Sequence, residues 1–104
     1  MTKAEREDEV SQRCDVWLFR TRLFKTRALA TKFVESGKVR LERSGQVQRL
    51  KKPSFGLRVG DCLTYMRHQT VFRIEVIGLG ERRGPASEAQ TLYRVETQER
   101  TPSQ

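Results

Sequence analysis

Apolar residues between positions 13 and 24 recur with the period of an α-helix. Cys14, Trp17 and Leu18, followed by Thr21, have the spacing i, i+3, i+4, i+7, which places them on one stripe of a helix. The neighbouring Arg20 lies off that stripe. The pattern predicts a first helix that buries one face and leaves charged residues on the other.

A second helix is predicted from Arg27 to Ser36. Thr26 is a suitable N-cap, because a threonine hydroxyl can accept a hydrogen bond from a backbone N–H of the first turn. Gly37 can end the helix in a left-handed turn. Since few residues separate the two helices, we expect them to pack against each other. The expected buried face of the second helix is Leu29, Ala30, Phe33 and Val34.

After Gly37 the apolar period changes to two, as in β-strands. Turns are predicted at 44–45, 60–61 and 67–69, and a loop is predicted through 51–53. The alternating apolar positions between these breaks are Val39 and Leu41, then Leu63 and Tyr65, then Phe72, Ile74 and Val76. Strands joined by short turns predict a small, mostly antiparallel sheet.

The last predicted element is a short helix ending near Tyr93. Ser87 and Gln90 are three residues apart and fit a capping box at its start. Few large apolar residues follow Tyr93.

One domain fits a chain of 104 residues. We expect it to span 13–93, with flexible tails at 1–12 and 94–104. The expected fold class is α+β: two packed N-terminal helices followed by a small mostly antiparallel sheet and a short C-terminal helix.

Positive charge is concentrated in one part of the chain. Residues 13–52 hold twelve Lys or Arg against three acids, a net charge of +9, whereas the whole chain carries +8. Apolar residues interrupt this segment throughout, so it can fold. A folded basic surface of this kind favours an anionic partner, above all nucleic acid.

Several classes of function are disfavoured. No run approaches the roughly 20 apolar residues that cross a membrane, and the charged N-terminus does not resemble a signal peptide. Cys14 and Cys62 form no CxxC pair, so we expect free thiols in a reducing cytoplasm. With one histidine, His68, neither a metal site nor a catalytic triad is expected. We therefore expect no cofactor and no enzymatic activity.

Three short motifs carry a resemblance to a known family. They are Arg13-Cys14-Asp15, Lys25-Thr26-Arg27 and Gly37-Lys38-Val39. In this order they resemble the S4 RNA-binding domain, also called the alpha-L RNA-binding motif. Cys14 departs from the leucine usual there, and Val16 from a frequent lysine.

A further segment, 81–89, is similar to the small heat-shock-induced, ribosome-associated branch of that family. The resemblance implies binding to structured ribosomal RNA on the large ribosomal subunit. It also implies that the subunit carries peptidyl-tRNA, and that the role is rescue or recycling of stalled ribosomes. We expect a monomer off the ribosome. A general tRNA or structured-RNA module, or a DNA-binding module that uses the same basic face, remains an alternative.

The candidate RNA-binding residues are cations in and around the three motifs. The first candidates are Arg13, Arg22, Lys25, Arg27 and Lys38. Arginine fits phosphate through a bidentate fork, and Thr26 with nearby amides is expected to add hydrogen bonds at the helix N-terminus. The second candidates, in a strand and a loop, are Arg40, Lys51 and Lys52. The alternative for each is an ordinary solvated charge.

Five other residues have more than one interpretation. Asp15 has no second carboxylate or histidine at a useful spacing, so we do not expect an acid catalyst. We expect it to pair with a nearby arginine, or to orient Arg13 or the first turn of the first helix. Trp17 and Phe24 can stack on bases, but their helical phase favours core packing. The pair at 82–83 is either a second basic contact or part of a packing loop.

Overall fold

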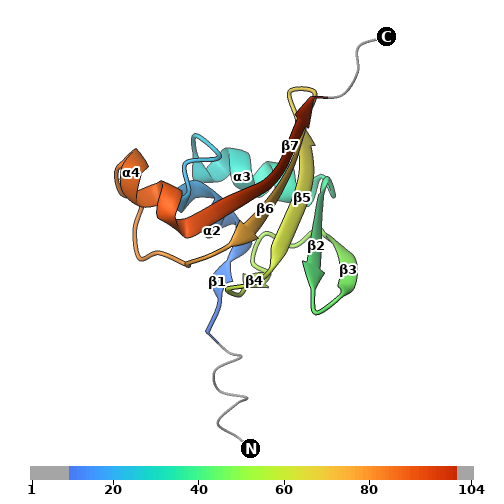
Figure 1. The fold of residues 1–104 in the computed structure, drawn as a ribbon, viewed down its shortest axis with the longest axis horizontal. Helices are drawn as coiled ribbons and strands as arrows, with labels where there is room; N and C mark the ends of the chain where they lie inside the picture. The colour runs from blue at the N-terminus through green and yellow to red at the C-terminus, as the bar shows by residue number, and fades with distance from the viewer. Residues whose placement is uncertain (1–9, 101–104) are drawn as a thin grey trace, which may run out of the picture.

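Two helices pack against one face of a five-stranded antiparallel sheet (Figure 1). This computed structural model describes residues 10–100. The helices are α2 (Cys14–Arg20), α3 (Arg27–Glu35) and α4 (Ala86–Ala89), and the 3-10 turn η1 (Gln90–Leu92) follows α4. The strands are β1 (Gln12–Arg13), β2 (Val39–Arg43), β3 (Gln46–Leu50), β4 (Gly56–Leu57), β5 (Cys62–Arg67), β6 (Thr70–Val76) and β7 (Tyr93–Arg100). The predicted α+β class is confirmed.

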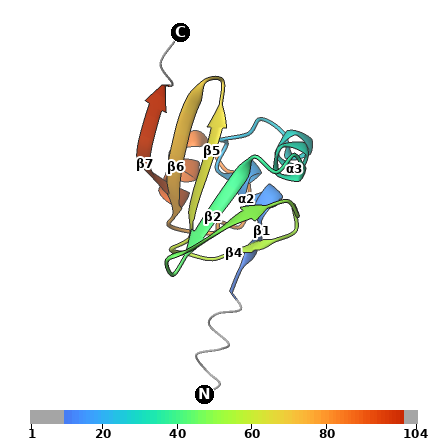
Figure 2. The same ribbon diagram turned by 90° about the vertical axis from the view of Figure 1, so that its right-hand side faces the viewer.

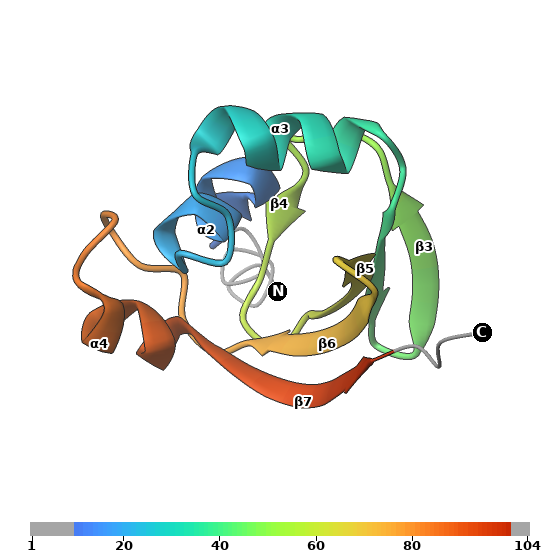
Figure 3. The same ribbon diagram turned by 90° about the horizontal axis from the view of Figure 1, so that it is seen from above.

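The strand order of the main sheet is β3-β2-β5-β6-β7, and each neighbouring pair is antiparallel. β1 and β4 form a separate two-stranded ladder next to α2. Figure 2 and Figure 3 show α2 and α3 on the same side of the sheet, with α4 at the end of the molecule where β7 begins. One face of the sheet is thus covered by helices and the other faces solvent.

Two-residue turns set the register of two hairpins. Ser44 and Gly45 join β2 to β3, and His68 and Gln69 join β5 to β6; all four have positive φ, between 53° and 78°. Two residues of positive φ form a type I′ turn, whose twist matches that of the flanking strands. Both turns were predicted from the sequence.

The ends of α3 also follow the prediction. The Thr26 hydroxyl accepts a hydrogen bond from the Leu29 N–H at 3.1 Å, and Gly37 has a φ of +78°. Leu29, however, was expected in the core and is 44% exposed. It lies toward the solvent edge of the apolar face of α3, while Ala30 and Val34 are fully buried.

Trp17 anchors the core at the centre of α2. Its side chain is fully buried, and its indole N–H donates to the Gly78 carbonyl at 2.7 Å. Since a buried indole N–H needs a partner, this bond ties the segment after β6 to α2. The core prediction for Trp17 is confirmed, and truncation of such a side chain costs about 3–5 kcal/mol.

Phe24 is also a core residue, as predicted. Its ring is 5.1 Å from the Phe33 ring and 5.9 Å from the Tyr65 ring, measured between centroids. Tyr65 continues the row to Phe72 at 5.3 Å. This aromatic row joins α3 to β5 and β6 beneath the helices.

Two strands of the five-stranded sheet were missed, as were the short strands β1 and β4 of the separate ladder. Residues 46–50 were expected to precede a loop but form β3, and residues 94–100 were expected to be part of a tail but form most of β7. Both strands lie at the edges of the sheet, and Gln46–Arg49 and Arg94–Thr97 are exposed. An edge strand is held by its backbone pairing, so its sequence need not alternate. The tail prediction is therefore wrong for 94–100.

The remaining boundaries differ by smaller amounts. The short helix starts at Ala86 with Pro85 as its N-cap, and no side chain caps it, so the predicted capping box is absent. Gln12, predicted in the N-terminal tail, pairs with Leu57. The rest of the predicted tails, at 1–9 and 101–104, lies outside the described residues. Within 10–100, no helix is long and apolar enough to cross a membrane.

Candidate nucleic-acid interface

Asp15 holds two of the predicted RNA-binding arginines. Arg13 donates two hydrogen bonds to this carboxylate, from Nε at 3.1 Å and from Nη2 at 3.0 Å. Arg27 approaches it with Nε at 3.6 Å, and Thr31 donates from its hydroxyl at 3.0 Å. The Asp15 side chain is 1% exposed, whereas those of Arg13 and Arg27 are 46% and 53% exposed. The predicted pairing of Asp15 with a nearby arginine is confirmed.

The electrostatic setting keeps Asp15 ionised. Burial alone raises the pKa of this carboxyl, but the hydrogen bonds from Arg13 and Thr31, together with the charges of Arg13 and Arg27, lower its pKa below the ordinary value. Two guanidinium groups around one carboxylate retain a net positive charge. Each guanidinium also has N–H groups that Asp15 does not use, and these can bind phosphate.

A lysine-bearing segment lies next to this cluster. The Cys14 N–H donates to the Phe55 carbonyl at 2.9 Å, and the Asp15 N–H donates to the Pro53 carbonyl at 3.1 Å. These bonds place residues 53–55 against the start of α2. Lys51 and Lys52, both exposed, directly precede these residues in the chain.

The same segment also contacts the end of α3. A Cβ placed on Gly37 would lie 3.3 Å from Lys51 Cε and 3.5 Å from Arg49 Cδ. Gly37 therefore lets both basic side chains pass close to the helix end. The segment connects the ends of the two helices into one surface. We call this surface the helix face and define it as Arg13, Arg27, Lys38, Arg49, Lys51 and Lys52.

Most cations of the helix face have no acidic partner. Among residues 10–97, no carboxylate lies within 4.0 Å of a basic group of Lys38, Arg49, Lys51 or Lys52. Arg13 and Arg27 share the single carboxylate of Asp15. The face is consequently a concentrated positive surface, as polyanion binding requires.

Arg22 has a different position from the one its motif suggested. It adopts a left-handed conformation, with a φ of 67°, and its Nε donates to the Gly84 carbonyl at 2.7 Å. Arg20 similarly donates to the Gly80 carbonyl at 2.8 Å. Both arginines thus hold the 80–84 loop against α2, and the structure does not bring Arg22 to Asp15.

Arg82 and Arg83, predicted to be either a second basic contact or part of a packing loop, differ from each other in the structure. Arg83 donates to the Phe19 carbonyl at 3.1 Å, and its guanidinium lies 4.6 Å from the centroid of the Phe19 ring. This residue packs the loop. Arg82 is exposed and pairs with Glu88 at 2.8 Å.

The other candidates are spread around α3. Lys25 and Thr26 are exposed immediately before the helix, and the Thr26 hydroxyl is used as the cap. Arg40 follows buried Val39 and precedes buried Leu41, so its side chain lies on the face of the sheet opposite the core. Its cross-strand partner is Arg49, and it lines a hollow together with Lys38, so Arg40 adjoins the helix face at these two residues.

Sequence reasoning missed three basic residues near these sites. They are Lys32 on α3, Arg49 at the end of β3 and Arg67 at the end of β5. Arg49 precedes Lys51 by two residues and could have been found had 46–50 been identified as a strand. Arg67 was assigned to a turn, although it donates to the Leu23 carbonyl at 3.1 Å.

The thiols and carboxylates form no second site. Cys14 and Cys62 are unbonded, and burial raises the pKa of the Cys14 thiol to about 12. Within residues 10–100, no three His, Cys, Asp or Glu side chains lie close enough to hold a metal ion.

Comparisons with known proteins identify a consistent set of relatives. Heat shock protein 15 of Escherichia coli K12 is 40% identical over 84 residues, which are 81% of this chain and 59% of that protein. Its Haemophilus influenzae homolog is 36% identical over 85 residues, 82% of this chain and 61% of the homolog. The chain thus spans about three fifths of the length of these curated relatives.

A solved structure agrees with them. The trimeric structure of Vibrio cholerae heat shock protein 15 superposes with a TM-score of 0.71 at 36% sequence identity. The match covers 82% of this chain and 81% of that one. No family model matches the chain.

Proposed function

Since the chain belongs to the heat shock protein 15 family, we propose that it is an RNA-binding heat-shock protein whose helix face contacts structured ribosomal RNA. The observation that carries this proposal is the gathering of unpaired cations on that face. Arg13 and Arg27 are held toward solvent by Asp15, and lysines follow along 49–55. Such a surface binds the phosphate backbone, with an affinity that falls as salt rises.

The proposed recognition depends on RNA shape. The major groove of A-form RNA is too narrow for side chains to reach base edges, so fixed cations select a duplex by the positions of its phosphates. Asp15 supports this role because it restrains two flexible arginines before RNA arrives. Pre-organised side chains lose less conformational entropy on binding.

We propose the large ribosomal subunit that carries peptidyl-tRNA as the physiological target, with rescue or recycling of stalled ribosomes as the role. Family membership and the motifs at 13–15, 25–27 and 37–39 support this proposal. A protein with this target would act in the cytoplasm. Because the chain spans only part of its curated relatives, their complete activity is part of the proposal.

We further propose that the protein acts by binding alone. Cys14, with its raised pKa, is a poor nucleophile at neutral pH. His68 is exposed in the turn between β5 and β6. A bulk assay for uridine isomerisation tests the enzymatic alternative, since related domains are fused to pseudouridine synthases. Turnover above background would contradict a binding-only role.

The proposed state off the ribosome is a monomer. The Vibrio cholerae relative, described as trimeric, is the reason to measure this directly. Light scattering after size-exclusion chromatography should give a mass near 12.1 kDa. A mass three times larger would show a trimer and contradict the proposed monomer.

Co-sedimentation with purified large and small ribosomal subunits across a salt series tests the proposed function. We expect selective pelleting with the large subunit that weakens as salt increases. Equal pelleting with both subunits would reduce the function to general structured-RNA binding. Competition with tRNA and with duplex DNA at matched salt separates the remaining alternatives, because a DNA-binding module would prefer the duplex DNA.

A further inference from the structure

A shallow cleft separates the solvent side of α3 from the turn between β5 and β6. Its volume is about 260 Å³, below the roughly 300–1,000 Å³ of pockets that hold drug-sized ligands. A single planar group is therefore the largest rigid ligand that suits it. The residues that line it include Leu29, Lys32, Phe33, Lys38 and Arg67.

The floor and one wall of the cleft are apolar. Phe33 is half-buried and packs on Phe24, and Leu29 contributes an exposed aliphatic side chain. Leu29 is the one residue of the predicted apolar face of α3 that is exposed. A phosphate gains nothing from such surfaces, whereas a flat aromatic ligand does.

Arg67 supplies a stacking surface at the same place. Its guanidinium carbon lies 4.1 Å from the centroid of the Phe24 ring, and its Nη1 donates to the Leu23 carbonyl at 3.1 Å. Two contacts thus hold the guanidinium in a fixed position. Arginine planes and aromatic rings are the surfaces on which unpaired RNA bases stack.

The charge of the rim selects an anionic ligand. Lys32, Lys38 and Arg67 line the cleft and no acid lines it. In the part of the chain whose side chains are described, residues 10–97, no carboxylate lies within 4.0 Å of the basic group of any of these three. Lys38 is also part of the helix face, so the cleft continues the proposed RNA-binding surface.

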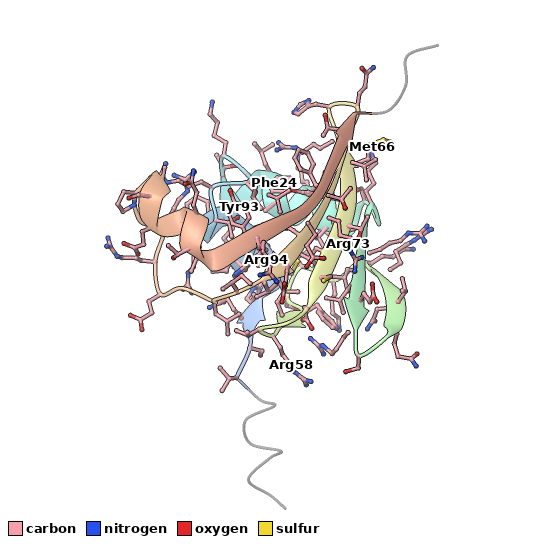
Figure 4. All side chains as sticks on the ribbon, in the orientation of Figure 1. Phe24, Arg58, Met66, Arg73, Tyr93 and Arg94 are labelled. Atoms are coloured by element: carbon pink, nitrogen blue, oxygen red, sulfur yellow. The ribbon has the colours of Figure 1, made fainter. Side chains whose placement is uncertain are left out.

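A second hollow adjoins the cleft and extends the surface that an RNA strand could follow. It is lined by Gly37, Lys38, Arg40 and Met66, and it therefore shares Lys38 with the cleft. Figure 4 shows Met66 near the turn between β5 and β6, at the end of the molecule opposite Arg58. A phosphate that joins one nucleotide in the cleft to the next in this hollow would lie beside Lys38, whose charge would neutralise it.

We propose that the cleft binds one unpaired RNA base, which stacks on Arg67 between Leu29 and the rim lysines while Lys38 meets the adjoining phosphate. This inference rests on the proposed RNA-binding function and adds a specificity to it. Bases inside an A-form duplex are stacked on one another and cannot enter the cleft. The protein should therefore prefer a helix that carries a bulged or looped nucleotide.

The test uses two RNA hairpins that differ by one bulged nucleotide, with 2-aminopurine at the bulge. The wild type should bind the bulged hairpin about fivefold or more tightly than the paired one, with a change in 2-aminopurine fluorescence. Leu29→Ser should lose that preference but keep the affinity for the paired hairpin. Ile77→Ser is the matched control, because Ile77 is also exposed, at 40%, and lies outside the cleft.

Arg67→Lys gives a second variant that keeps the charge and removes the planar guanidinium. It should also lose the preference, and circular dichroism checks that the fold remains. Equal binding of both hairpins with no fluorescence change would overturn the base site and leave the proposed function standing. If the wild type bound neither hairpin, both the base site and the proposed RNA-binding function would be wrong. If Leu29→Ser weakens only the binding of an acidic, phenylalanine-containing peptide, the cleft is a protein-docking site and the base assignment is wrong.

Discussion

The outer face of the sheet and the helix face carry similar cations, but these cations differ in their acidic partners. On the outer face of the sheet, Arg73 pairs with Glu42 at 2.9 Å and with Glu96 at 3.5 Å, and Arg94 pairs with Glu75 (Figure 4). On the helix face, Arg13 and Arg27 share one carboxylate, Asp15, and the other four cations have no ion pair with an acid among residues 10–97. Arginine content alone therefore does not identify a binding surface. We therefore base the proposed interface on the absence of neighbouring acids.

The two faces also differ in what their acids do. Asp15 is buried, receives hydrogen bonds from Arg13 and Thr31, and forms an ion pair with Arg27 at 3.6 Å. Glu42 is 37% exposed and pairs with one arginine. A buried charged acceptor contributes more to stability than an exposed ion pair, because its partners cannot be replaced by water.

The largest expected effect comes from Asp15→Ala. It leaves Arg13 and Arg27 without their buried partner, and we expect the free energy of unfolding to fall by about 2–3 kcal/mol. Urea denaturation measures the change. Glu42→Ala, which removes an acid from the sheet face, is the control and should cost less than about 1 kcal/mol. Equal losses would show that the two acids are equivalent.

The second prediction concerns pH. The pKa of Asp15 is lowered in the folded state, so its contribution to stability is complete above the unfolded pKa of about 3.9 and is lost as pH falls through the folded pKa. Stability of the wild type should therefore approach that of Asp15→Asn on acidification. A constant difference between the two down to pH 2 would mean that the charge of Asp15 contributes nothing.

The third prediction is that Arg27→Gln weakens RNA binding without unfolding the chain. We expect a loss of about fivefold to tenfold in affinity, with the salt slope reduced by roughly one phosphate contact. Glutamine is preferred to glutamate because a new carboxylate would lie beside Asp15 and repel it. A binding isotherm and circular dichroism measure the two properties. Unchanged affinity would remove Arg27 from the interface.

The smallest effect is expected on the other face. Arg73→Gln breaks two exposed ion pairs, which we expect to cost less than about 1 kcal/mol of stability. Its RNA affinity should stay within about twofold of the wild type. A loss comparable to that of Arg27→Gln would mean that the sheet face also contacts RNA.

The elements that could be predicted from the sequence are those with one face buried in the core. Val39 and Leu41 alternate with charged residues because one side of β2 packs on the core, and this burial leaves a visible period. The edge strands β3 and β7 lack such a period, since solvent reaches most of their side chains. Their pairing depends on backbone hydrogen bonds, which leave no pattern in the sequence.

Long-range contacts limited the prediction of the site. Arg13, Asp15 and Arg27 were recognised because a local motif carries them. The role of Arg22 was not, because its partner Gly84 is 62 residues away and only the left-handed backbone of Arg22 directs it there. Arg67 was missed for a similar reason, since its contact with Phe24 crosses from β5 to the loop before α3.

The most direct test of the account compares the salt dependence of RNA affinity in two charge-matched triple variants. One changes Lys38, Lys51 and Lys52 to glutamine on the helix face. The other changes Arg73, Arg82 and Arg94 to glutamine; these three arginines all have acidic partners. We predict that the first variant loses about tenfold or more in affinity and roughly two to three units of salt slope, while the second retains both. Equal losses in the two variants would contradict the account, because binding would then follow net charge and not the helix face.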